Sequence, residues 1–125
     1  MKANPVGWFE IYVQDLARAK KFYETVFATE LQLLDSPVPG MEFWTFPMTQ
    51  ESYGTSGALV KMEGGPSGGN STLVYFACED CAVEEGRVGG AGGQVEKTKM
   101  SIGEYGFISL VRDPDGNMVG LHSME

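Results

Sequence analysis

The stretch WFEIYVQDLARAKKFYETVF (residues 8–27) decides the fold, because in it a predicted strand leads almost directly into a predicted helix. In its first half the side-chain character alternates along the chain, and aromatic and β-branched residues are frequent. Both features are typical of a strand over about residues 7–13. Asp15 is a residue type that caps the first turn of a helix. Five apolar residues then recur at helical spacing, namely Ala19, Phe22, Tyr23, Val26 and Phe27.

The same plan returns in the second half of the chain. Three further predicted strands follow the first helix, in LQLLDS, MEFWTFPM and GALVKME, and the glycine-rich segment GGPSGGNS then reads as a flexible connector. A strand in TLVYFAC, a weaker helix in DCAVEEGRVGG and strands in QVEKTKM, YGFISLVR and NMVGLHS complete the pattern. We therefore predict an α+β fold of two βαβββ modules, residues 5–63 and 72–125, joined by residues 64–71 within one domain, 1–125.

A shift of 65 positions relates the two halves. It places Asp15 on Asp80, as the two helix caps, and Trp8 on Leu73. At the end of each half, the segment GALVK (57–61) aligns with GNMVG (116–120), and this alignment matches Lys61 with Gly120. The identities are few, but caps, strands and turns keep their order, so an internal duplication is expected.

The composition limits the possible partners. The chain has 125 residues, 42% of them hydrophobic, and a formal net charge of −8, so one soluble domain with its own core is expected. Nucleic-acid binding needs clustered basic residues, and the only basic pair is Lys20-Lys21. No apolar run approaches the roughly 20 residues of a membrane helix, and no secretory signal is evident. We expect a cytoplasmic protein that binds neither nucleic acid nor membranes.

Three quoted segments resemble the vicinal oxygen chelate superfamily of glyoxalases, bleomycin resistance proteins and extradiol dioxygenases. They are the opening stretch 8–27, the middle stretch LVYFACEDCAVEEGRVGGAGG and the closing stretch GFISLVRDPDGNMVGL. The resemblance implies two βαβββ modules whose sheets form an open cup, and a homodimer. It also implies a site in the cup for a small organic molecule.

Metal-using members of that family take four ligands from the first and last strands of the two modules. Carried over to this chain, the four positions are Trp8, Lys61, Leu73 and Gly120, and none is a metal ligand. We therefore expect no metal and no cofactor. The alternative is a relocated metal site in which Glu10 and His122, the only histidine, both point into the cup.

The expected pocket centres on Glu10. Strand alternation places Trp8, Glu10 and Tyr12 on one face, and the full candidate set is Trp8, Glu10, Tyr12, Trp44, Lys61, Tyr75, Phe107 and His122. Several of these aromatic residues could instead fill the core or a dimer interface, Trp44 and Phe107 above all. Glu10 is the candidate acid, base or cation-binding group. Alternatively, tyrosine hydroxyls or Lys61 satisfy its carboxylate.

The segment CEDC (78–81) has the spacing of redox and zinc sites, and Cys81 would begin a helix. The repeat offers a second interpretation, because Cys78 and Cys81 match Val13 and Leu16 and would then be small apolar residues in the core.

The leading functional hypothesis is a metal-independent small-molecule-binding protein, which could sequester a toxic or antibiotic compound. The alternative is a lyase, isomerase or dioxygenase that uses Glu10 or a non-standard metal site. A third possibility is an interaction module whose cup is vestigial.

Overall fold

The computed structural model describes residues 4–36 and 38–125. The chain divides into two compact units, one formed by Trp8–Thr72 and the other by Leu73–Glu125 together with the described residues up to Gly7. No helix among the described residues is long and apolar enough to cross a membrane.

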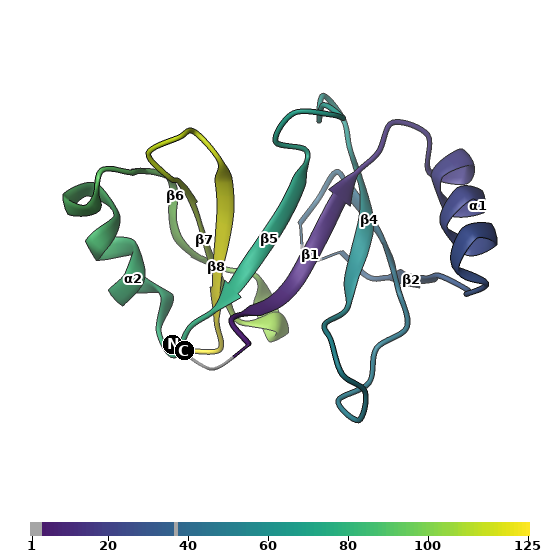
Figure 1. Cartoon of the computed structure of the whole chain (residues 1–125), viewed down its shortest axis with the longest axis horizontal. Helices are drawn as coiled ribbons and strands as arrows, with labels where there is room; N and C mark the ends of the chain where they lie inside the picture. Colours follow the sequence, from purple (N-terminus) through teal and green to yellow (C-terminus); the bar gives the residue numbers. More distant parts are fainter. Residues whose placement is uncertain (1–3, 37) are drawn as a thin grey trace. The chain divides into compact units, whose positions relative to one another are not determined.

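The Trp8–Thr72 unit contains one helix and a four-stranded mixed sheet (Figure 1). Its elements are β1 (Val6–Tyr12), α1 (Leu16–Phe27), β2 (Gln32–Leu34), β3 (Met41–Thr45) and β4 (Gly57–Met62). The strand order is β2-β3-β4-β1, and β1 runs parallel to β4. Asp15 caps α1 as predicted, since its carboxylate accepts a hydrogen bond from the Arg18 N–H at 3.0 Å.

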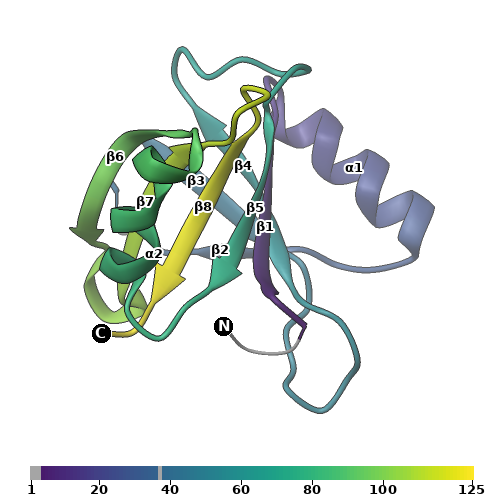
Figure 2. The ribbon, with the colours of Figure 1, turned by 60° about the vertical axis from the view of Figure 1, so that its left-hand side comes forward.

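The second unit repeats this plan (Figure 2). Its elements are β5 (Thr72–Ala77), α2 (Cys81–Val88), β6 (Gln94–Ser101), β7 (Phe107–Arg112) and β8 (Met118–Ser123), with short 3-10 helices η1 (Gly89–Ala91) and η2 (Gly103–Tyr105). The strand order is β5-β8-β7-β6, and β5 runs parallel to β8. The prediction of an α+β fold made of two βαβββ modules is therefore confirmed.

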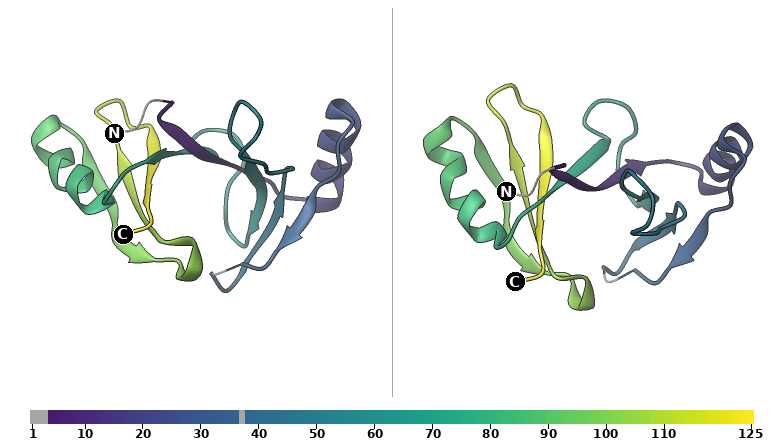
Figure 3. Two further views of the ribbon diagram at one scale, coloured as in Figure 1. Left: turned by 90° about the horizontal axis from the view of Figure 1, so that it is seen from below. Right: turned by 60° about the horizontal axis from the view of Figure 1, so that its bottom comes forward.

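Each helix packs on the sheet of its own unit (Figure 3). On the α1 side, Phe46 contacts both Phe9 of β1 and Tyr23 of α1 through its ring. The opposite side of the same sheet carries an apolar cluster of Phe43, Ala58 and Val60. The faces of the β1 sheet thus differ: one is covered by the helix, and the other carries Glu10.

The pairing registers correct the predicted alignment of the last strands. Glu10 lies opposite Ala58, and Tyr75, its equivalent 65 residues later, lies opposite Gly120. Ala58 is therefore the counterpart of Gly120, and setting Lys61 there was wrong by three residues. The error came from matching two glycines with different roles, since Gly57 belongs to β4 whereas Gly116 occupies a left-handed turn at φ +85°.

Both cysteines belong to the core beneath α2. Cys78 and Cys81 are buried with Val111 and Leu121, and neither forms a disulfide. Burial, together with the nearby Glu84 carboxylate, raises the pKa of the Cys78 thiol to about 11. The apolar interpretation of CEDC therefore agrees with the structure, and at neutral pH Cys78 lacks the thiolate that redox chemistry needs.

Gly57 is required by a close approach of backbone. A Cβ atom at this position would clash with the Phe9 carbonyl oxygen, so Gly57→Ala has to displace β4 from β1. We expect a loss of about 3 kcal/mol in the free energy of unfolding, measured by urea denaturation. Gly86→Ala in α2 is the matched control, because a Cβ there meets nothing within 4 Å. It should stabilise the protein by about 0.5–1 kcal/mol, and equal losses in the two variants would contradict the assigned β1–β4 register.

The thiols should react slowly while the protein is folded. The raised pKa of Cys78 lowers its thiolate fraction at pH 8 roughly a hundredfold relative to an ordinary thiol. Labelling of Cys78 by a chromogenic disulfide should thus be slow at pH 8, accelerate toward pH 11, and become fast at pH 8 in urea. Because the folded pKa lies above the ordinary value of 9.0, ionisation of this thiol also removes stability as the pH rises from about 9 toward 11. Rapid labelling of the folded protein at pH 8 would refute this account.

Candidate functional site

The candidate site begins with one row of side chains on β1. Trp8, Glu10 and Tyr12 alternate with Phe9 and Ile11, so they share the sheet face that α1 does not cover, here called the Glu10 face. The Trp8 Nε1–H donates a hydrogen bond to Glu10 Oε2 at 3.2 Å, and the Tyr12 hydroxyl donates one to Glu10 Oε1 at 2.7 Å. The predicted alternative of a carboxylate satisfied by a tyrosine hydroxyl is therefore present.

The surroundings of Glu10 are mainly apolar. Only 6% of the residue is exposed, Ala58 lies directly opposite it on β4, and Tyr12 lies opposite Val60. Transferring a carboxylate from water to such a place is costly unless polar groups replace its hydration. The two aromatic donors supply part of that replacement, and they also hold the carboxylate in one orientation.

Trp44 and Lys61 lie on the other face of this sheet. Trp44 alternates with Phe43, and its ring lies 4.4 Å from the Lys20 Nζ of α1. Lys61 alternates with Val60, and its Nζ donates a hydrogen bond to the Gln14 carbonyl oxygen at 2.6 Å. The structure does not bring either residue together with Glu10, because on both strands the neighbouring apolar residue occupies the Glu10 face. The expected pairing of Lys61 with Glu10 is absent for the same reason.

In the second unit, Tyr75 and His122 lie on one sheet face and Phe107 lies on the other. Tyr75 pairs with Gly120, and its ring is so close that a Cβ atom on Gly120 would clash with it. Phe107 instead packs against the core beneath α2, which agrees with the alternative interpretation for this residue. The predicted set of eight residues thus divides into separate groups.

His122 has a backbone partner. Its Nε2 lies 2.6 Å from the Tyr105 carbonyl oxygen in η2. A carbonyl oxygen can only accept, so the His122 Nε2–H donates this hydrogen bond. Glu10 and His122 belong to different units.

The residues at the four ligand positions of the metal-using family members do not fit a divalent metal. With the corrected register these positions are Trp8, Ala58, Leu73 and Gly120. None offers a lone pair to a cation, since the indole N–H is a donor only. Within residues 4–36 and 38–125, no three His, Cys, Asp or Glu side chains gather closely enough to hold a metal ion. Ala58 was missed because strand pairing, rather than the local sequence, identifies it.

Solved structures with a similar fold include an epimerase and a hypothetical protein. Methylmalonyl-CoA epimerase from Mycobacterium tuberculosis superimposes with a TM-score of 0.68 at 14% identity, covering 100% of this chain and 93% of that one. The hypothetical protein BH1468 from Bacillus halodurans gives a TM-score of 0.72 at 10% identity, covering 96% and 94% of the two chains. At such identities the likeness concerns the fold alone.

Two curated relatives are similar in sequence. Both are named "Putative glyoxylase CFP32", from Mycobacterium bovis and Mycobacterium tuberculosis, and each is 31% identical over 117 residues. The match covers 92% of this chain but only 44% of each relative, so this chain spans less than half of their length. Residues 6–121 also match the family model described as "Glyoxalase/Bleomycin resistance protein/Dioxygenase superfamily". Because that match includes nearly the whole sequence, the chain belongs to the glyoxalase/bleomycin resistance protein/dioxygenase superfamily.

Proposed function

We propose that the chain is a metal-independent small-molecule-binding protein of the glyoxalase/bleomycin resistance type, with the Glu10 face as its ligand-contacting surface. The observation that carries the proposal is the buried Glu10 carboxylate, held by Trp8 and Tyr12, on a face where the family's ligand positions are Trp8 and Ala58, which cannot bind a metal ion. A homodimer acting in the cytoplasm is part of the same proposal.

The chemistry of this face favours an organic cation as the ligand. A carboxylate attracts a cation directly, and indole and phenol rings beside it add cation–π attraction. The net charge of −8 raises the local concentration of cations around the whole chain. Apolar neighbours such as Val60 suit a ligand whose charge is carried by an alkylated nitrogen. Sequestration of a toxic or antibiotic compound is one specific form of this function, and it needs no chemical step.

Choline and its neutral isostere 3,3-dimethylbutan-1-ol provide the test, because they share a shape and differ in charge. The quench of tryptophan fluorescence on titration should show that choline binds more tightly than the alcohol. In Glu10→Gln the carboxylate charge is lost with little change in volume, so choline affinity should fall roughly tenfold, while affinity for the alcohol changes less than about twofold. Thermal unfolding checks that the variant folds.

Glu42→Gln is the matched control. Glu42 accepts a hydrogen bond from the Trp44 indole at 2.7 Å, which resembles the Trp8–Glu10 pair, but it lies on the opposite face and is exposed. Choline affinity should be unchanged in this variant. An equal loss in both variants, or no preference for choline over the alcohol, would contradict the proposal.

A second candidate function is an enzyme in which Glu10 transfers protons. The hydrogen bonds from Trp8 and Tyr12 favour it, because together they hold both carboxylate oxygens of Glu10 in one orientation. Methylmalonyl-CoA epimerase, which has a similar fold, provides a substrate with which to examine this isomerase possibility.

The two candidate functions make different predictions for the exchange of carbon-bound hydrogen between a substrate and the solvent. Under the binding proposal, incubation of the protein with methylmalonyl-CoA in D2O should add no deuterium beyond the buffer rate, as measured by mass spectrometry. Deuterium uptake that Glu10→Gln abolishes and Glu42→Gln preserves would establish the enzyme instead.

A further inference from the structure

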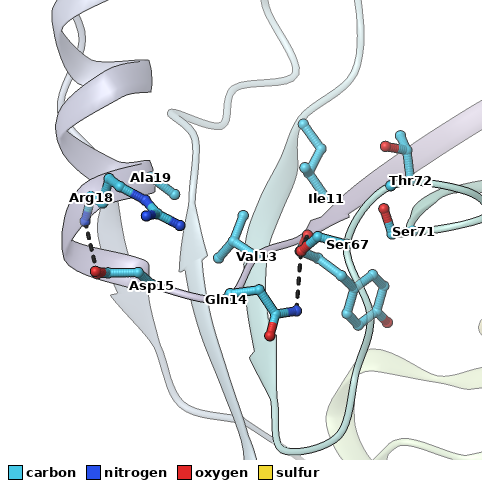
Figure 4. Close-up of a pocket in the computed structure, with 11 residues that line it drawn as sticks. Ile11, Val13, Gln14, Asp15, Arg18, Ala19, Ser67, Ser71 and Thr72 are labelled. Atoms are coloured by element: carbon cyan, nitrogen blue, oxygen red, sulfur yellow. Dashed lines mark hydrogen bonds between the residues drawn. The ribbon is translucent and has the colours of Figure 1, made fainter.

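A pocket of about 370 Å³ lies at the far end of β1, between the first turn of α1 and the connector 64–71 (Figure 4). All the residues that line it belong to the Trp8–Thr72 unit, and Glu10 is not among them. Its volume is within the range of small-molecule sites. It is therefore distinct from the Glu10 face.

Hydrogen bonds tie the connector to β1 and so give the pocket a fixed wall. The Gln14 side-chain amide donates to the Gly65 carbonyl oxygen at 2.6 Å and to the Ser67 hydroxyl at 3.2 Å. The Ser67 hydroxyl donates to the Tyr12 carbonyl oxygen at 2.9 Å, and the Tyr12 N–H donates to the Ser71 carbonyl oxygen at 2.9 Å. The glycine-rich segment was predicted to be a flexible connector, but these contacts join it to the strand at several points.

The middle of the pocket is apolar. Ile11 of β1 and Val13, which directly follows that strand, line it together with Ala19 of α1 (Figure 4). Each of the three side chains is half-buried, so a ligand here would cover apolar surface that is still partly in contact with water.

Polar groups without protein partners lie at its two ends. The Ser71 residue is only 8% exposed, and its hydroxyl makes no hydrogen bond with any residue that the structure describes. The hydroxyl lines the pocket and can therefore donate to, or accept from, a ligand bound there. Beyond Val13, the Arg18 guanidinium likewise makes no ion pair or hydrogen bond in the described part of the chain. Figure 4 shows Arg18 on one side of Ile11 and Val13, and Ser71 and Thr72 on the other.

We propose that this pocket binds a short aliphatic acid that carries a hydroxyl or carbonyl oxygen at its far end. The carboxylate pairs with the Arg18 guanidinium, the carbon chain covers Ile11 and Val13, and the far oxygen hydrogen-bonds the Ser71 and Thr72 hydroxyls. The Asp15 carboxylate also lines the pocket, and it offsets the charge of Arg18. A singly charged acid is therefore favoured over a phosphate or a dicarboxylate.

Three probes of equal chain length separate the contributions of the two ends: 6-hydroxyhexanoate, hexanoate and 1,6-hexanediol. Binding is followed by NMR chemical shifts of ¹⁵N-labelled protein at the amides of residues 15–19 and 67–72. We expect 6-hydroxyhexanoate to saturate these shifts with a millimolar Kd, as suits so small a ligand. Hexanoate should bind several-fold more weakly because it lacks the far oxygen, and the diol roughly tenfold more weakly because it lacks the carboxylate.

Variants assign each end to its residue. Arg18→Gln should weaken both acids roughly tenfold and leave the diol unchanged, whereas Ser71→Ala should remove the advantage of 6-hydroxyhexanoate over hexanoate. Lys21→Gln is the matched control, because it makes the same charge change on α1 at a residue that does not line the pocket. Ala19→Leu, which fills the apolar middle, should weaken all three probes.

Several results would overturn the proposal: no saturable shift at these amides, equal binding of the diol and 6-hydroxyhexanoate, or equal losses in Lys21→Gln and Arg18→Gln. Binding that survives Ala19→Leu would also overturn it. The NMR spectrum of each variant reports its folding in the same experiment, so a misfolded variant is recognised before its affinity is interpreted.

Discussion

The parallel pairing of the first and last strands of each module is the constraint on which the rest of the structure depends. It sets Glu10 opposite Ala58 in one unit and Tyr75 opposite Gly120 in the other. Because side chains alternate along every strand, this register decides which residues share a face and which lie under the helix. A slip by one residue at β1 would move Glu10 under α1 and place Phe9 on the opposite face.

Pairing also explains why small residues occur where they do. Gly57 has no side chain because the Phe9 backbone approaches too closely, and Gly120 has none because the Tyr75 ring covers it. In family members that bind a metal, the position of Gly120 is among those expected to supply a ligand. Here an aromatic ring occupies the space that a ligand side chain would need, so restoring a donor at Gly120 would first require Tyr75 to move. The absence of a ligand side chain at Gly120 is thus tied to the packing of Tyr75 in this sheet.

The sequence predicted the features that depend only on residues near one another along the chain. Both βαβββ modules follow from hydrophobic periodicity, and the caps Asp15 and Asp80 follow from residue type at the helix starts. The grouping of Trp8, Glu10 and Tyr12 follows from alternation within one strand. Placing Trp44, Lys61 and Phe107 beside them required knowing the register between strands, which alternation within a strand does not contain. Each of these three lies one position away from the face that was expected of it.

The connector 64–71 shows that residue composition alone does not predict whether a segment is flexible. GGPSGGNS has the residues of a flexible linker, and nothing within the segment itself distinguishes a linker from a fixed wall. What distinguishes them is Gln14, whose side-chain amide reaches Gly65 and Ser67 some 51 and 53 residues away. Such bonds restrict the connector only because β1 and α1 already hold Gln14 in place. The neighbouring strand and helix therefore fix the conformation of this segment. Its glycines have no Cβ atom and so allow the close approach that these hydrogen bonds need.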